Sequence, residues 1–546
     1  MDLPRDATDG LLGFAFKRSD RPAAADGAGD WLPNFLRFER NAHKDETTTT
    51  DHDPVQAFVW GDYAVDPGSK LTYRVEARYG TPEQMEARYA VDLPVDVELP
   101  DDQAHGIYFN RGVAGSQAYS KKFHDVSPLD DADAAAWLSR GLEEGLLTFI
   151  KSASGSTVAL RGVFYEFHHK PVLDALAAAA AERNVDVKLV VARPALNEKG
   201  VQNYPGEANV EPVAIAKLDP LVVWRTRCVG AAHNKFLVRI EDGEPVAVWT
   251  GSTNITDGAF YGQSNVGHLV HDKDVAAAYM GYWTDLHADT ETDALRDLNA
   301  KQNPLLAPGP PEKPLGELFS PHHGEGELDW FADLMRDHDN QAVFFTAPFG
   351  IGPTFEAVLT EAHPFPVYAL LDKGDDNMAV LRAVPGNEIT AGAFLGAGGW
   401  HQFLEEKVLS SLNPMVKFIH TKYLLINPLS KDPLVITGSA NFSSASVNTN
   451  DENMLVIRGN TRVADIYLSE FMRLFTHLYF RARVTESDPK AGAVRAPTPE
   501  SRGDTTPIFL TPDDGWVSEW YDTDGPKKRE RELFAPEPGQ AQPPGP

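Results

Sequence analysis

Hydrophobic and polar residues alternate over residues 10 to 104, with β-branched and aromatic side chains recurring between turn residues. Segments 14–16, 56–60 and 71–77 are the most strand-like, because short runs of this kind bounded by turn residues are typical of strands. The pattern therefore predicts an all-β domain over residues 1–104.

From residue 105 onward, short apolar runs alternate with segments whose apolar residues recur at helical spacing, and this alternation occurs in two rounds. Strands are predicted at 163–167, 187–191, 236–238, 246–249, 342–345, 367–371 and 434–437, and helices at 172–183, 328–336, 354–362 and 463–483. Such alternation predicts α/β layers. We expect two α/β halves, 105–302 and 317–485, joined by a Pro-rich linker, 303–316, and followed by an irregular tail, 486–546.

Two copies of one polar motif lie in the two halves. The first is His233-Asn234-Lys235 with Gly251-Ser252-Thr253-Asn254, and the second is His420-Thr421-Lys422 with Gly438-Ser439-Ala440-Asn441. In both copies Lys follows His by 2 residues, Gly by 18, Ser by 19 and Asn by 21. One such motif alone carries little information, but its repetition at matched spacing predicts a single site built from both halves.

The residue types of the motif suit a tetrahedral phosphate. On a strand, the His and Lys of His-x-Lys point to the same face, and Gly permits a sharp turn with Ser and Asn at its rim. One imidazole can attack phosphorus while the other protonates the leaving oxygen, which predicts a phosphodiesterase. The remaining side chains are expected to hold the non-bridging oxygens or to shape the turn, namely Lys235, Lys422, Asn254, Asn441, Ser252, Ser439, Gly251 and Gly438.

Charge and composition restrict the partners. A net charge of −29 repels long polyanions, which disfavours non-specific nucleic-acid binding without forbidding a local basic cleft; it is also a common solubility device. Cys228 is the only cysteine, which excludes an intrachain disulfide and a cysteine metal cluster. No zinc-type histidine spacing occurs, so we expect no cofactor and no metal.

Membrane and targeting signals are absent from the sequence pattern. The N-terminus is polar and acidic, with no apolar signal region, and no apolar stretch reaches the length of a transmembrane segment. We therefore expect a cytoplasmic protein. For the aromatic patch at Trp516, Trp520 and Tyr521 in the tail, docking onto the core is favoured over contact with a membrane.

The duplicated motif resembles the signature of the phospholipase D superfamily, and the resemblance covers roughly residues 105 to 485, including 164–167, 249–254 and 450–454. It implies two similar α/β halves related by a pseudo-twofold axis, with the two histidines facing each other. It also implies metal-independent chemistry through a covalent phosphohistidine. Residues 68–75 more weakly resemble a late strand of a fibronectin type III or immunoglobulin-like fold, so a β-sandwich-like N-terminal domain is expected.

The sequence departs from the family signature at two kinds of position. The signature Asp after each His-x-Lys would fall at Ile240 and Asn427, and neither is acidic. A second family carboxylate, eleven residues after the motif Asn, is Glu452 in the second copy but Asn265 in the first. A carboxylate beside an imidazole fixes its tautomer and raises its pKa, so the two histidines should differ electrostatically.

This asymmetry predicts a division of labour between the two histidines. The resemblance implies that the N-terminal histidine is the nucleophile, so we assign attack on phosphorus to His233. His420, supported by Glu452, is assigned to general acid and then general base catalysis.

We therefore expect a phospholipase D-type hydrolase that cleaves, and can transphosphatidylate, phospholipid headgroup esters. Two alternatives stay open: a metal-independent nuclease of the same superfamily, and a non-catalytic module that binds phosphodiesters. Strong salt dependence and competition by oligonucleotides would mark the nuclease. A trapped phosphohistidine would dismiss the binding module.

Overall fold

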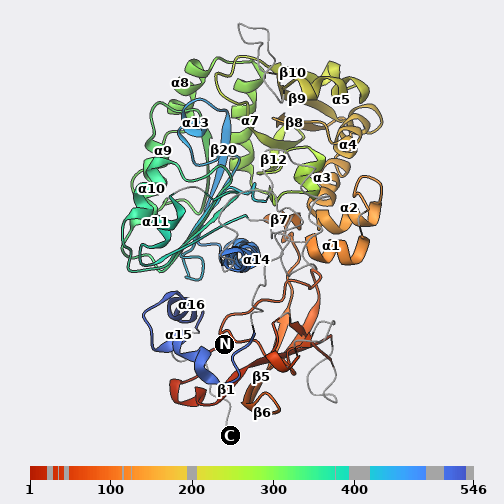
Figure 1. The fold of residues 1–546 in the computed structure, drawn as a ribbon. Helices are drawn as coiled ribbons and strands as arrows, with labels where there is room; N and C mark the ends of the chain where they lie inside the picture. Colours follow the sequence, from red (N-terminus) through yellow and green to blue (C-terminus); the bar gives the residue numbers. More distant parts are fainter. Residues whose placement is uncertain are drawn as a thin grey trace, which may run out of the picture. The chain divides into compact units, whose positions relative to one another are not determined.

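The computed structural model of the chain describes residues 1–20, 29–34, 36–41, 48–112, 116–124, 126–193, 206–374, 377–392, 418–486 and 509–535. The chain forms two compact units, one of residues 1–100 and 504–546 and one of residues 101–503. Both ends of the chain therefore belong to the first unit, and the duplicated motif lies in the second (Figure 1).

The first unit contains an N-terminal β region, in which β strands cover the predicted segments 14–16 and 71–77, whereas segment 56–60 lies in no strand. Its main sheet has four antiparallel strands in the order β2-β1-β5-β6, and a separate two-stranded sheet pairs β3 with β4. The strands are β1 (Leu11–Ser19), β2 (Asp30–Trp31), β3 (Pro33–Asn34), β4 (Thr48–Thr49), β5 (Lys70–Thr81) and β6 (Gln84–Asp96). Short 3₁₀ helices η1 (Arg5–Thr8) and η2 (Glu39–Asn41) complete the described N-terminal part.

Part of the expected tail folds into this unit. Residues 514–534 form η7 (Asp514–Val517), α15 (Ser518–Tyr521) and α16 (Pro526–Phe534), whereas residues 487–508 and 536–546 lie outside the described residues. Trp516 and Trp520 are buried in the same hydrophobic cluster as Phe14 and Phe58. Trp516 Nε1 also donates a hydrogen bond of 2.9 Å to the Leu11 carbonyl. The aromatic patch thus supplies part of the core of the first unit.

The second unit contains two α/β halves, each with a seven-stranded mixed sheet. The first sheet has the order β10-β9-β8-β11-β12-β13-β7. Its strands are β7 (His105–Phe109), β8 (Val158–Phe164), β9 (Asp186–Ala192), β10 (Val222–Arg225), β11 (Lys235–Glu241), β12 (Glu244–Gly251) and β13 (Val266–Val270). Its helices are α1 (Ser116–Phe123), α2 (Ala132–Ser139), α3 (Leu142–Lys151), α4 (Lys170–Ala181), η4 (Gly206–Asn209), α5 (Val210–Ile215), η5 (Asp219–Leu221), α6 (Asp257–Tyr261), α7 (Lys273–His287) and α8 (Thr292–Gln302).

The second sheet has the order β14-β20-β19-β18-β15-β16-β17. Its strands are β14 (Leu315–Ser320), β15 (Val343–Ala347), β16 (Val367–Leu371), β17 (Asn387–Ala391), β18 (Tyr423–Ile426), β19 (Leu434–Gly438) and β20 (Glu452–Arg458). Its helices are α9 (Gly326–Arg336), α10 (Pro353–Thr360), α11 (Met378–Arg382), α13 (Ser444–Asn448) and α14 (Thr461–Glu486).

Strand order and direction repeat between the two sheets. Reading the second sheet from β17 to β14 and the first from β10 to β7, each strand has a counterpart. The β8–β9 and β15–β16 pairs are both parallel, and the β8–β11 and β15–β18 pairs are both antiparallel. The expected fold of two similar α/β halves is confirmed.

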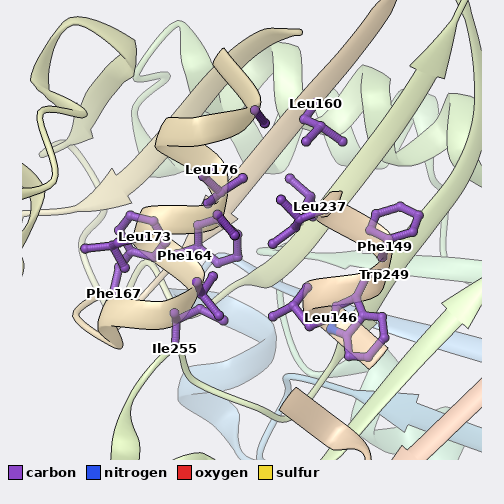
Figure 2. Packing of buried hydrophobic residues seen from close by; sticks show 14 of the residues in the cluster. Leu146, Phe149, Leu160, Phe164, Phe167, Leu173, Leu176, Leu237, Trp249 and Ile255 are labelled. Carbon is purple, nitrogen blue, oxygen red and sulfur yellow. The ribbon is translucent and has the colours of Figure 1, made fainter. Parts of the chain in front are cut away.

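Each half has its own hydrophobic core. In the first half, β8 is buried along its whole length and packs with α4, whose apolar residues recur at helical spacing. Figure 2 shows the aromatic and aliphatic side chains of this core, including Phe164 and Phe167. Figure 1 shows α3 and α4 along the outer side of the first half and α9, α10 and α11 along that of the second.

The two halves are joined by helices that reach across. Helix α7 packs on β8 to β12 of its own half and on β14 of the other, and α14 packs on β17 to β19 and on β7. The two halves thus form one unit, and the motif loops of both lie where they meet.

Candidate active site

The Gly of each motif ends a strand at a close backbone approach. Gly251 ends β12 with a φ of 134°, and a Cβ there would overlap the Val266 carbonyl oxygen. Gly438 ends β19, and a Cβ there would overlap the Asn453 carbonyl oxygen. Both positions therefore require glycine, because the next strand of the sheet passes directly alongside.

Both His-x-Lys segments lie at the start of a strand rather than within it. Strand β11 begins at Lys235 and β18 begins at Tyr423, so both histidines precede their strands. Their backbone amides bond instead to the opposite half: His233 N donates to Asp451 O at 3.0 Å, and His420 N donates to Ser264 O at 3.0 Å. Each histidine is thus held by a segment that comes just before a strand of the other half.

Glu452 lies on His233, not on His420 as the sequence led us to expect. His233 Nδ1 is 2.8 Å from Glu452 Oε2, and Asn450 Nδ2 donates to Glu452 Oε1 at 3.0 Å. The physical reason is the backbone pairing of Asp451 with Ala231 and His233, which brings the start of β20 to the first motif. Burial raises the pKa of Glu452 to about 7.

His420 is held by Asn265. Its Nδ1 is 2.9 Å from Asn265 Oδ1, and the Asn265 amide is oriented by a hydrogen bond of 3.0 Å from its Nδ2 to the Ala259 carbonyl. Ser252 Oγ donates to the same Oδ1 at 2.9 Å. Because Oδ1 can only accept, His420 donates through Nδ1 and keeps Nε2 available.

The two lysines bring positive charge to the buried centre. Lys235 Nζ donates to the His233 carbonyl, and Lys422 Nζ donates to the His420 carbonyl at 2.7 Å. Burial lowers the pKa of Lys235 to about 7 and that of Lys422 well below its usual value. A site that withdraws both ammonium groups from water favours a bound anion.

Both histidines are neutral in this environment. Burial, followed by the charges of Lys235 and Lys422, lowers the pKa of His233 well below its usual range. Burial and the same two lysines do the same to His420, and His233 adds to the effect. The histidines and lysines of the two motifs therefore interact electrostatically, which places all four side chains in a single centre.

The motif serines support the loops rather than face a ligand. Ser252 and Ser439 are fully buried. Ser252 Oγ accepts from Val266 N at 3.1 Å, and Ser439 Oγ accepts from Asn453 N at 3.0 Å. Each serine thus fastens its loop to the following strand.

The motif asparagines differ between the halves. Asn254 is buried and its Nδ2 donates to Glu166 Oε2. Asn441 is half-buried, and among the described residues neither Asn254 Oδ1 nor Asn441 Oδ1 has a hydrogen-bond partner. Burial raises the pKa of Glu166, against the charges of Lys235 and Lys422.

Two further residues belong to the centre but were assigned no role from the sequence. Glu166 and Tyr165 follow β8, and the Tyr165 ring lies 4.8 Å from the His233 ring and 5.1 Å from Lys235 Nζ. Their only sequence signal is their place within the segment 164–167 that resembles the family. Asn265 was noted only for lacking a carboxylate, and the structure makes it the partner of His420.

The positions of the missing signature Asp carry structural side chains. Asn427 Oδ1 accepts from Gln341 N at 2.6 Å, at a turn where Asn427 has a φ of 52°. Ile240 is a buried residue of β11. Neither side chain forms a described contact with the two histidines.

The described residues show neither a metal-binding cluster nor a membrane-spanning helix. Within the described ranges, no group of three or more His, Cys, Asp or Glu side chains is placed to hold a metal ion. None of the helices in those ranges is long and apolar enough to span a bilayer.

Comparison with known proteins places these features in a family. Residues 146–285 and 370–475 match the family model described as cardiolipin synthase, PLD-like domain. The two matched segments contain both histidines and both lysines. No curated protein matches the chain by sequence.

Several solved structures are similar to parts of the chain. Polyphosphate kinase from Porphyromonas gingivalis matches at 10% identity and a TM-score of 0.39, over 62% of this chain and 48% of the kinase, so the match spans about half the kinase's length. Phosphatidylserine synthase from Haemophilus influenzae Rd KW20 matches at 12% identity and a TM-score of 0.42, over 62% of this chain and 85% of the synthase. Nuc from Salmonella typhimurium, a phospholipase D family member, matches at 27% identity and a TM-score of 0.21, over 27% of this chain and 87% of Nuc.

Proposed function

The chain belongs to the phospholipase D superfamily, and from that premise we propose that it transfers the phosphoryl group of a phosphodiester through a covalent intermediate on His233. One observation carries the proposal: each histidine has its Nδ1 on an oxygen acceptor supplied by the opposite half. The Nε2 atoms are therefore the reactive nitrogens, next to two buried lysines.

The two histidines have different roles because their Nδ1 partners differ: Glu452 for His233 and Asn265 for His420. Glu452 on His233 stabilises the positive charge that develops on this ring when its Nε2 attacks phosphorus. Asn265 on His420 is uncharged and stabilises an imidazolium less, which makes His420 the stronger acid. Our assignment of His233 as nucleophile and His420 as general acid is therefore kept, with Glu452 moved to the nucleophile.

The first step forms the intermediate. His233 Nε2 attacks phosphorus, the P–O bond to the leaving alcohol breaks, and His420 donates its Nε2 proton to the departing oxygen. Lys235, Lys422, Asn254 and Asn441 hold the non-bridging oxygens. Because a bound phosphodiester anion offsets the two lysine charges, it raises the pKa of His420 and lets this imidazole carry the proton.

The second step releases the phosphoryl group from His233. His420 Nε2 takes a proton from water or an alcohol, the oxygen attacks phosphorus, and the P–N bond to His233 breaks. Water gives hydrolysis, and an alcohol gives a new phosphodiester. The same centre can thus act as a hydrolase or as a synthase-type transferase, according to the acceptor that reaches it.

The substrate we propose is a phospholipid headgroup ester. A net charge of −29 disfavours a long polyanion, because nucleic-acid affinity depends on many Lys and Arg contacts to phosphate. A lipid phosphodiester presents a single anionic phosphate, and the two lysines of the centre are enough to bind a single phosphate.

The test combines turnover with trapping of the intermediate. Vesicles of phosphatidylglycerol or phosphatidylcholine are incubated with the protein in EDTA, with and without ethanol, because the lysines supply the charge that a metal would otherwise bring. We expect phosphatidylethanol in the ethanol arm. An acid-labile, base-stable phosphoryl-enzyme should accumulate in His420→Asn and be absent in His233→Asn, with turnover lowered at least 10² to 10⁴-fold in both.

His323→Asn is the matched control, because His323 is an exposed histidine paired with Asp297. It should retain full turnover. Accumulation in His233→Asn instead would reverse the two roles. Hydrolysis of single-stranded DNA or RNA without lipid turnover would replace the lipid substrate by nucleic acid. Binding without any trapped species would leave only a phosphodiester-binding module.

A further inference from the structure

The carboxylate of Glu166 lies in the same centre as the motif lysines and Asn254. Phe164 and Phe167, which flank Tyr165 and Glu166 in the sequence, are buried and stacked, with ring centroids 4.8 Å apart (Figure 2). The Glu166 carbonyl accepts from Ile255 N at 3.0 Å, directly after Asn254. Its carboxylate accepts from Asn254 Nδ2 and interacts electrostatically with Lys235 and Lys422.

The second half has no carboxylate at the matching place. Strand β8 places Phe164 opposite Lys235, and continuing the β15–β18 register by two residues places Ala347 opposite Lys422. The position two residues further is Glu166 in the first half and Phe349 in the second, where 59% of the side chain is exposed. The fold shared by the two halves therefore does not require an acidic residue at this position, and Glu166 is specific to the first half.

Glu166 changes the charge balance of the centre. Lys235 and Lys422 each interact electrostatically with both Glu166 and Glu452. When all four groups are ionised, two positive charges face two negative charges. Without Glu166 the same groups would carry one net positive charge. In a partly desolvated site, one charge changes the affinity for an added anionic charge strongly.

We propose that Glu166 is a specificity-determining residue that makes the site favour phosphodiesters, which carry one negative charge, over phosphate monoesters and inorganic phosphate, which carry two. This rests on the proposed function, because it concerns the same centre. The site then accepts a diester substrate and releases a monoester product that binds less well, which prevents the product from occupying the two lysines.

The experiment measures anion affinity without turnover. Sulfate carries two negative charges and dimethyl phosphate carries one between pH 6 and 9, so their dissociation constants are compared by calorimetry. Wild type should bind dimethyl phosphate more tightly than sulfate. Glu166→Gln should shift this ratio toward sulfate by about 10-fold to 100-fold, the order expected for removing one charge close to another in a partly buried site. Glu166→Asp, which keeps the charge, should not.

Glu182→Gln is the matched control, since it removes the same charge from an exposed residue at the C-terminal end of α4. A ratio in Glu166→Gln within twofold of wild type, or an equal shift in Glu182→Gln, would overturn the proposal. Should Glu166→Gln fail to fold, tighter binding of sulfate than of dimethyl phosphate by wild type would overturn it as well. A shifted ratio without any phosphoryl-enzyme would keep the selectivity and discard the catalytic role.

Discussion

Two histidines from copies of one motif differ in the oxygen that holds their Nδ1 atoms. His233 faces the Glu452 carboxylate at 2.8 Å, and His420 faces the Asn265 amide at 2.9 Å. A carboxylate stabilises an imidazolium and an amide does so less, so two chemically identical rings acquire different proton affinities. The asymmetry that the proposed reaction requires is therefore set by two residues at matching positions of the two halves.

Glu452→Gln tests the partner of His233, the proposed nucleophile. Burial raises the pKa of Glu452 to about 7, so in wild type the carboxylate takes a proton as the pH falls through 7, and phosphoryl-enzyme formation should slow on the acid side. The variant still accepts the Nδ1 proton but carries no charge, and we expect a loss of about 10² to 10⁴-fold at pH 8. Rapid-quench measurement of intermediate formation between pH 5 and 9 tests this.

The slowing of phosphoryl-enzyme formation at low pH, which is the acid limb of the pH–rate profile, should also disappear in Glu452→Gln. A limb that persists at the same pH in Glu452→Gln would mean that another group causes it.

Asn265→Asp tests the partner of His420, the proposed general acid. A carboxylate on His420 raises the pKa of this imidazole, so the variant should keep its general acid protonated to a higher pH, and the alkaline limb of kcat should move up by about one pH unit. The lost Asn265 Nδ2 bond to Ala259 should cost about 1 kcal/mol of stability, since Asn110 Nδ2 still donates to the same carbonyl. A pH–rate profile of steady-state turnover measures the shift. An unchanged alkaline limb would show that His420 is not the acid.

At the scale of elements, the halves are joined at segments just before their last sheet strands. Residues 230–233 pair with 449–451, and Ser264 bonds to Phe418 and His420. Arg225, which ends β10, adds a buried ion pair to Asp451 at 2.8 Å and one to Asp289 at 2.9 Å. The residue that holds His233 is thus positioned by an arginine of the other half.

Arg225→Met tests this connection. Removing one member of a buried ion pair leaves Asp451 uncompensated, and we expect the second unit to lose about 3 to 5 kcal/mol of stability. Turnover should fall as well, because Asp451 O accepts the His233 amide. Chemical denaturation with initial rates gives both values. The double variant Arg225→Met, Asp451→Asn should recover part of the stability, and no recovery would mean that the arginine acts elsewhere.

The duplicated spacing picked out both histidines, both lysines and both loops, whose role as a site stays a prediction. Prediction from sequence succeeded for elements that carry their own signal, since the apolar runs located β9, β16 and α4 to within a few residues. It failed for Glu452, because numbering within a motif cannot show that the start of β20 pairs with the opposite half. Glu166 was missed for a similar reason: a single acid after a strand has no periodicity, and only the fold brings it to Asn254.

At the scale of the molecule, the two ends of the chain build the first unit together. Trp516 and Trp520 fill a core made by β1, β5 and Phe58, and Trp516 also bonds to Leu11 O. Strand β6 of this four-stranded sheet is mostly exposed and contributes no residue to the cluster that contains Trp516 and Trp520. The C-terminal helices therefore supply apolar surface that this sheet needs for stability.

Trp516→Ala tests this dependence. Truncating a buried aromatic costs about 3 to 5 kcal/mol, so the unfolding of the first unit should shift to a lower temperature while that of the second stays in place. Differential scanning calorimetry and limited proteolysis followed by mass spectrometry separate the two transitions. Val91→Ala, at an exposed position of β6, is the control and should leave both unchanged. An equal shift of both transitions would show that the units do not unfold independently.

Because residues 1–100 and 504–546 form one unit, the order of synthesis also affects the order in which the two units fold. The first hundred residues leave the ribosome early, yet Trp516 and Trp520 are made only after the whole second unit. Domains fold as their residues emerge, so the catalytic half-sites can assemble while the N-terminal sheet still lacks its aromatic cover. Nascent chains should therefore expose the apolar face of β1 and β5 until Trp516 and Trp520 have been made, and a chaperone could bind this face during that time.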